Sequence, residues 1–154
     1  MKKFIIIACI AVAFGGCKKE TEIEKFNETI QGTWSLQSNK IEYYDAGTKE
    51  YEEVLSGAGT FQEVTFLNNL TARFVVHDGT LLSTGYDISD IEGKRYVEFF
   101  NIAVFEAQGF EVSSSSSSNM KWVKNYINIQ FENKETGEIK IASKAVLTLQ
   151  LIKK

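Results

Sequence analysis

Apolar and polar residues alternate with a period of two along most of the chain beyond residue 32. In an extended strand this alternation puts every second side chain on the same face, so it predicts antiparallel strands that bury one face in a common core. Residues 95–105 are apolar on both faces, and two registers stay open for that strand. The positions expected to face inward are Trp34, Leu36, Ile41 and Tyr43 (with a bulge between the two pairs), Val64, Phe66, Leu70, Ala72, Phe74, Val76, Leu82, Thr84, Tyr86, Ile88, Ile127, Ile129, Phe131, Ala145, Leu147, Leu149 and Leu151.

Short turn sequences separate these strands. They are Asn68-Asn69, Asp78-Gly79, Glu92-Gly93 and Thr136-Gly137. Turns this short join strands that are neighbours in the sheet, so the chain is expected to form a meander. A meander of about eight strands can close on itself and remove its exposed edges. The predicted fold class is therefore all-β, an antiparallel up-and-down β-barrel of about eight strands.

A helical pattern precedes the first strand. Ile23, Phe26 and Ile30 fall on one face of a helix, and Thr21 and Glu24 have the spacing of a capping box. Gly32 is the expected stop. A helix of about ten residues is too short to be stable alone, so it is expected to pack against the barrel.

Six consecutive serines, Ser113–Ser118, interrupt the strand pattern. Because such a run has no apolar side chain to bury, it predicts a loop inserted between two strands. The loop could be a lid over the barrel mouth or a passive surface loop, and composition favours the passive loop. Trp122 follows this loop and is expected to lie nearer an edge than Trp34.

The first residues have the pattern of an export signal. Lys2 and Lys3 precede an apolar run of 11 residues from 4 to 14. This length suits a signal peptide, whereas a membrane-spanning helix needs about 20 residues. The run ends in Phe14-Gly15-Gly16-Cys17, which resembles the lipobox of bacterial lipoproteins. The alternative is a plain secretory signal that happens to meet a cysteine.

The lipobox resemblance implies a division of the chain and a location. Residues 1–16 would be the signal peptide, 17–22 a lipidated tether and 23–154 the barrel domain. Cys17 would carry acyl chains such as palmitate and hold the protein in the cell envelope, at the outer membrane. Which face of that membrane it would occupy stays open.

The composition of the chain limits which classes of binding partner are expected. Without residues 1–16, the chain has 15 basic and 20 acidic residues and a net charge of about −5. No basic patch suggests nucleic acid. With Cys17 acylated, the remaining domain has no cysteine for a disulfide. Packing alone must therefore stabilise it, and we expect a monomer.

A short helix followed by Gly32-Thr33-Trp34 and an antiparallel meander resembles the lipocalin-like group of the calycin superfamily. In that group the glycine lets the helix pack closely and the tryptophan plugs the closed end of the barrel. Many lipocalins also pack an arginine of the last strand across this tryptophan. Here the last strand offers only Lys153 and Lys154.

The resemblance implies a cavity for a small apolar ligand. Candidate pocket residues are Phe66, Phe74, Tyr86, Phe100 and Ile129, which could either line a pocket or fill the interior. Glu98 would face inward in one of the two registers of residues 95–105, where it could meet a ligand's polar head. The other register places it in solvent.

Few residues of the sequence are candidates for catalysis. His77 stands beside Asp78-Gly79 and is interpreted as a solvated turn residue. No residues have metal-ligand spacing, and no glycine-rich phosphate loop opens a helix. We therefore expect no enzyme, metal or cofactor. Two functions remain: a membrane-anchored carrier of a small apolar ligand, or an interaction or inhibitor module of the envelope with a filled barrel.

Overall fold

The computed structural model describes residues 21–56, 60–100 and 109–154. Within these ranges the chain forms one helix and nine strands. They are α1 (Glu22–Ile30), β1 (Gly32–Asp45), β2 (Thr48–Val54), β3 (Phe61–Phe66), β4 (Thr71–Val76), β5 (Leu81–Ile91), β6 (Lys94–Phe99), β7 (Gly109–Ser115), β8 (Asn119–Asn133) and β9 (Glu138–Lys153).

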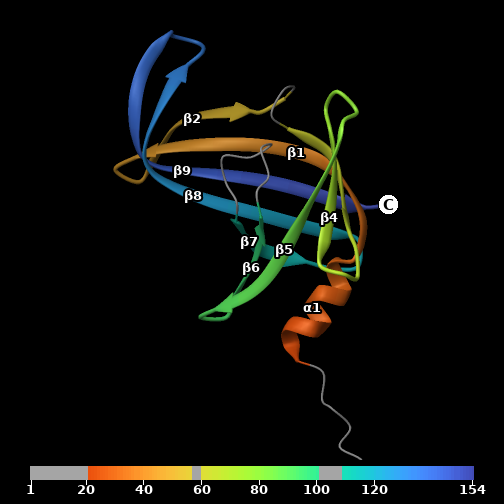
Figure 1. Cartoon of the computed structure of the whole chain (residues 1–154). Coiled ribbons are helices and arrows are strands. Elements are labelled where there is room, and N and C mark those ends of the chain that lie inside the picture. The colour runs from red at the N-terminus through yellow and green to blue at the C-terminus, as the bar shows by residue number, and fades with distance from the viewer. Residues whose placement is uncertain (1–20, 57–59, 101–108) are drawn as a thin grey trace, which may run out of the picture.

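Eight of the strands close a barrel. Strands β1 and β3 to β9 pair antiparallel in that order, and β9 pairs back to β1 (Figure 1). Strand β2 pairs with the second half of β1 and lies outside the ring. The predicted fold class is therefore confirmed. The predicted bulge is present as a register shift between Leu36 and Ser38. Leu70 differs from the expectation, because it lies in the turn before β4 and is exposed.

Strands β1, β8 and β9 continue past the ring. Strand β3 pairs only with residues 32–35 of β1, and β7 pairs with β8 over residues 120–123. Beyond these paired segments, the remaining parts of β1, β8 and β9 form a sheet with β2. The β8–β9 hairpin rises from the end of this sheet (Figure 1). Helix α1 lies at one end of the barrel, which we call the closed end, and the sheet continues beyond the other end, which we call the open end.

The closed end is built around Trp34. Helix α1 begins with the expected capping box and ends at Ile30. Trp34 is fully buried, and its Nε1 donates a hydrogen bond to the carbonyl of Ile30 at 2.6 Å. The ammonium of Lys153 lies 5.1 Å from the centre of the Trp34 ring and donates to the carbonyl of Thr29 at 3.3 Å. The last strand therefore supplies a lysine to the face of this tryptophan.

Gly32 permits this arrangement in two ways. Its φ is +106°, in the region that favours glycine. A Cβ at this position would also lie 3.0 Å from Cε of Lys153. The glycine therefore lets the chain turn out of the helix while the lysine stem passes close to the backbone.

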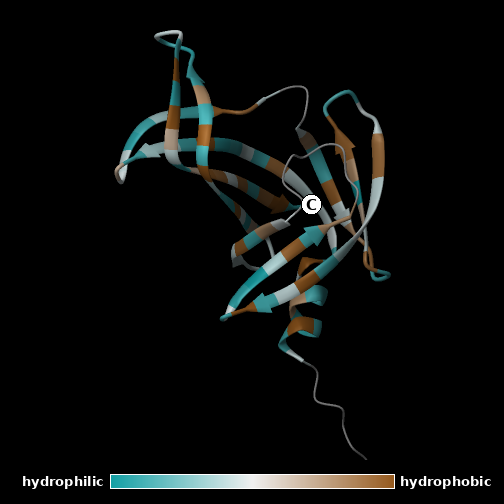
Figure 2. Cartoon of the chain, turned by 60° about the vertical axis from the view of Figure 1, so that its left-hand side comes forward, coloured by the Kyte–Doolittle hydropathy of each residue, from teal (hydrophilic) through white to brown (hydrophobic). Residues whose placement is uncertain are grey.

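The core lies on the inner faces of the strands, and hydrophobic and polar positions alternate along them (Figure 2). Trp122 is fully buried in this core, so the expectation that it lies nearer an edge is wrong. The reason is that β8 pairs on both sides, with β7 and β9, and Trp122 faces inward.

The serine run is not an inserted loop. Strand β7 continues through Ser115, and Ser114 and Ser115 pair with Lys121 and Met120 of β8. The ladder satisfies the backbone of these serines although their side chains bury little. Only residues 116–118 form the turn. Neither the lid nor the passive-loop interpretation describes the first three serines.

No helix in the described ranges is long and apolar enough to cross a bilayer.

Candidate functional site

The inner wall at the open end is the candidate site. Strands β1, β9 and β8 lie side by side, and their paired residues form rows across the wall. The register places inward residues in three successive rows, which we call the lower, middle and upper rows. The lower row is Asn39, Leu149 and Trp122, the middle row is Ile41, Leu147 and Lys124, and the upper row is Tyr43, Ala145 and Tyr126.

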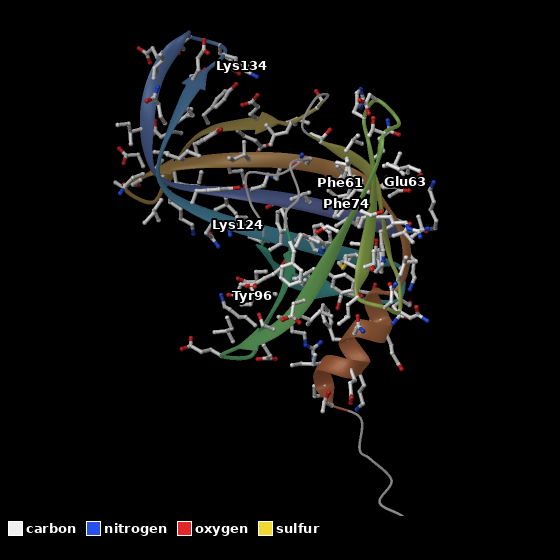
Figure 3. The ribbon with its side chains drawn as sticks, in the orientation of Figure 1. Phe61, Glu63, Phe74, Tyr96, Lys124 and Lys134 are labelled. Atoms are coloured by element: carbon white, nitrogen blue, oxygen red, sulfur yellow. The ribbon has the colours of Figure 1, made fainter. Side chains whose placement is uncertain are left out.

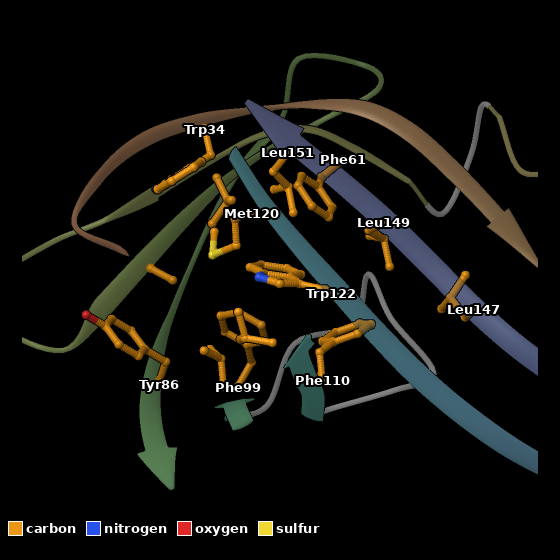
Figure 4. Close-up of a cluster of buried hydrophobic side chains, with 14 of the residues drawn as sticks. Trp34, Phe61, Tyr86, Phe99, Phe110, Met120, Trp122, Leu147, Leu149 and Leu151 are labelled. Atoms are coloured by element: carbon orange, nitrogen blue, oxygen red, sulfur yellow. The ribbon is translucent and has the colours of Figure 1, made fainter. Parts of the chain in front are cut away.

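Side chains fill the barrel below the middle row. Trp122 stacks on Phe110, with ring centres 5.3 Å apart, and lies 5.5 Å from Phe99 and 6.0 Å from both Phe61 and Phe66. The close-up shows the side chains of Phe61, Phe99, Phe110 and Trp122 in this cluster (Figure 4). All five side chains are almost completely buried. This half of the interior is a packed core, and it forms an apolar floor for whatever lies above it.

A second aromatic cluster closes the sheet extension. Phe131 stacks on Tyr43 with ring centres 4.2 Å apart, and Tyr51 lies 5.9 Å from Phe131. Burial, above all, raises the pKa of Tyr43. Lys134, in the β8–β9 turn, forms an ion pair with Glu53 of β2. These contacts hold the hairpin against β2.

The middle row lies between the two aromatic clusters. Ile41 and Leu147 are buried, with 7% and 9% of their surface exposed. Lys124 is half-buried, and no ion pair joins it to another residue of the described ranges. Figure 3 shows Lys124 along β8 and Lys134 at the hairpin. The middle row therefore forms an apolar surface with a cationic side chain at one end.

The lower row contains two buried polar atoms without partners. Oδ1 of Asn39, an acceptor, and Nε1 of Trp122, a donor, have no hydrogen bond among the described residues. The two residues flank Leu149, two strands apart, which corresponds to about 10 Å. Because each atom is buried and has no partner in the described residues, each destabilises the folded state by about 1–3 kcal/mol.

Three predicted pocket residues lie in the filled half. Phe66, Phe74 and Tyr86 are 0–1% exposed. The hydroxyl of Tyr86 donates to Oδ1 of Asn27 at 2.8 Å, and the carbonyl of Leu67 lies 3.3 Å from it. Burial raises the pKa of Tyr86 to about 12. These residues pack the core below the open end.

The register of β6 excludes two other candidates from the interior. Val97 pairs with Ile88 and Phe99 pairs with Tyr86, so Val97 and Phe99 face inward. Glu98 therefore points outward and is exposed. Phe100 was expected inward but is 51% exposed, because it follows the inward Phe99. Residues 101–105 of the predicted strand lie outside the described residues.

Ile129 lies at the edge of the candidate site. It is half-buried against the core and pairs with Ala142. Ile127, expected on the same face, is 79% exposed. The reason is that Ile127 continues the register of the inward Trp122, in which odd-numbered residues face outward, and the φ of +52° at Asn128 then brings Ile129 to the inner face. Sequence reasoning missed Lys124, because its spacing of two from Trp122 indicates an inward position only once the pairing with β9 shows that Trp122 faces inward.

A pocket of about 420 Å³ lies at the closed end, away from these rows. It is lined by Phe26 of α1, Arg95 of β6 and the serines Ser113–Ser115 of β7, among others. The guanidinium of Arg95 lies 5.0 Å from the centre of the Phe26 ring. The lining is mainly polar, so this pocket does not suit an apolar ligand.

The described residues show no assembled catalytic or metal centre. No group of three or more His, Cys, Asp or Glu side chains in these ranges could hold a metal ion. His77 is exposed in the turn between β4 and β5, where its carbonyl accepts a hydrogen bond from Gln62 at 3.1 Å. The backbone N–H of Thr80 lowers the pKa of the neighbouring Asp78.

Comparison with known proteins identifies no family for this chain. No family model matches the chain, and no curated protein matches it. One solved structure, a lipocalin-like protein from Bacteroides uniformis, aligns over 82% of this chain and 98% of its own, with 15% identity and a TM-score of 0.40. A likeness of this size carries no functional argument. The barrel assignment rests on the strand pairings of this chain.

Proposed function

We propose that the chain is a membrane-anchored, lipocalin-like lipoprotein that binds a small apolar ligand at the open end of its barrel. The observation that supports this is the middle row. Its apolar side chains lie between a packed aromatic floor and a separate aromatic cluster, on the inner wall of an extended sheet. Apolar walls with a few polar groups are typical of sites for small molecules.

The filled core limits the size of the ligand. Because Trp122 and its neighbours occupy the closed half, the ligand must lie between the lower and upper rows. These rows are four residues apart along β8, which corresponds to about 13 Å. We therefore propose a ligand with an apolar part of about this length, held above Trp122 and beside Tyr126.

Binding is tested with an uncharged probe. The full chain bearing Cys17→Ser, which removes the proposed acylation site, is titrated with N-phenyl-1-naphthylamine and its fluorescence is recorded. We expect saturable binding with a dissociation constant below about 100 µM, equivalent to about −5.5 kcal/mol. Leu147→Trp should weaken binding, because the indole would occupy the middle row. Val123→Trp, on the outward face of β8, is the matched control.

The anchor is tested separately. Cys17→Ser should move the protein from the membrane fraction to the soluble fraction, since acyl chains on this residue would provide the membrane affinity. A Cys17→Ser protein that stays in membranes through a high-salt wash would contradict the lipidation proposal. This experiment tests location and leaves the ligand proposal independent.

One observation favours a second function, the envelope interaction module. Ile127, Ile139 and Ile141 of the β8–β9 hairpin are 67–79% exposed. Exposed apolar side chains gathered on one element suit a protein partner. If no uncharged probe binds, and replacing the three isoleucines by serine abolishes capture of an envelope protein by the anchored chain, the interaction module replaces the carrier.

A further inference from the structure

We infer that the ligand has an anionic head group, of the carboxylate class, and that Lys124 binds it. This inference rests on the proposed function, because it places the head group within the same site. The arrangement that carries it is a cationic side chain on the inner wall with no counter-charge among the described residues.

The orientation of Lys124 follows from the register. It pairs with Leu147, which pairs in turn with Ile41 on the other side, and both partners are buried core residues. Pairing is continuous from Asn119 to Ile127 of β8, so Lys124 shares the inner face with Trp122 two residues before it. Lys124 therefore points into the barrel and not outward, where strand lysines are usually found.

Within the described ranges, the charged side chains around Lys124 do not compensate its charge. Glu53 faces the same side, because it pairs with Ile41 in β2, but Lys134 already forms an ion pair with it. At the closed end the guanidinium of Arg95 forms an ion pair with Glu22, at 3.7 Å. The other inward positions of the described strands near the middle row are apolar, aromatic or amide side chains. Counting the side chains of residues 21–56, 60–100 and 109–154, a net positive charge therefore remains at the middle row.

This charge selects the chemistry of the head group. A half-buried ammonium has lost part of its hydration, and an anion that contacts it restores a favourable interaction in surroundings less screened than water. A carboxylate accepts hydrogen bonds from the ammonium, and such charge-assisted bonds are stronger than neutral ones. An uncharged alcohol gains much less, and an ammonium head would be repelled. The site should thus prefer an amphiphilic acid over an alcohol of equal chain length.

The test compares dodecanoate with dodecan-1-ol, below their aggregation limits, by displacement of N-phenyl-1-naphthylamine from the full chain bearing Cys17→Ser. We expect the acid to bind about tenfold more tightly than the alcohol, equivalent to about 1.4 kcal/mol. Lys124→Met keeps the apolar stem and removes the charge, so it should reduce acid affinity to that of the alcohol and leave the alcohol unchanged. Lys124→Arg should retain the preference. Lys121→Met, an outward lysine of the same strand, is the control.

The outcomes separate the two proposals. Equal affinity for acid and alcohol in the protein with Lys124, or an equal loss for both in Lys124→Met, would overturn the anionic head group and leave the apolar site standing. Failure of the acid, the alcohol and the uncharged probe to bind would overturn both proposals. If Lys124→Met does not fold by circular dichroism, Lys124→Gln gives the same comparison.

Discussion

The two tryptophans should respond differently to replacement by phenylalanine, although both are fully buried. Trp34 and Trp122 are each 0% exposed, so the loss of apolar contact is similar at the two sites. Their indole nitrogens differ. Nε1 of Trp34 donates to the carbonyl of Ile30 at 2.6 Å, whereas Nε1 of Trp122 has no partner in the described residues. The substitutions therefore share a packing loss and differ in hydrogen bonding.

The difference in the free energy of unfolding can be worked out from these contacts. Loss of the smaller ring volume destabilises both variants by about 2 kcal/mol. Trp34→Phe also loses a hydrogen bond worth about 1 kcal/mol and leaves the carbonyl of Ile30 without that donor. Trp122→Phe removes an unpaired buried donor, which returns about 1 kcal/mol or more. Trp34→Phe should therefore be the less stable variant by about 2 kcal/mol, or roughly 6 °C in Tm.

Urea unfolding followed by far-ultraviolet circular dichroism measures this difference without relying on tryptophan fluorescence. The alanine variants of both residues are the control. Each should lose about 3–5 kcal/mol, because both side chains are completely buried. Equal stability of the two phenylalanine variants, or a less stable Trp122→Phe, would refute the assignment of the indole hydrogen bonds.

Three further predictions concern the closed end and the core. Burial raises the pKa of Tyr86 to about 12, against about 10 in the unfolded chain, so stability should be intact below pH 10 and fall by about 2.7 kcal/mol as pH rises to 12; urea titrations at several pH values should show this loss reduced in Tyr86→Phe. Lys153→Met should lower the free energy of unfolding by about 1 kcal/mol through loss of its contacts at the closed end, while Lys154→Met, at a more exposed ion pair, should change it by less than about 0.5 kcal/mol in the same assay. Gly32→Ala should destabilise more than Gly79→Ala in thermal melts, since both have positive φ but only Gly32 would place a Cβ 3.0 Å from another side chain; equal losses would contradict that contact.

The fold could be predicted because its information is local and repeated. Alternation along each strand specifies a buried face, and the short turns specify which strands are neighbours. The helix start was equally local, since the capping box joins Thr21 and Glu24 only three residues apart. Each of these signals depends on residues close in sequence, and the structure agrees with each of them.

The errors arose where local pattern was uninformative. Residues 95–100 carry large side chains on both faces, so only the pairing with β5 decides that Phe99 faces inward and Phe100 outward. The register of the inward Trp122 turns Ile127 outward, and a single backbone conformation at Asn128 brings Ile129 back to the inner face. The serines of β7 lack apolar side chains, yet the ladder with β8 holds them in a strand. In each instance a contact with a distant segment overrides the local preference.

Lys124 illustrates the same limit at the site itself. Its neighbours Val123 and Trp122 are both apolar, so hydrophobic pattern along β8 does not say which face is inside. A strand lysine is normally assigned to the solvent face, because a buried ammonium without a partner destabilises the fold. Only the pairing of Trp122 with Leu149, and of Leu149 with Asn39, places this face inside the barrel. A bound anion that contacts Lys124 would raise the stability of the folded protein, because it binds the folded chain and not the unfolded one. Dodecanoate should accordingly raise the Tm of the protein with Lys124 more than dodecan-1-ol does, and this difference should vanish in Lys124→Met.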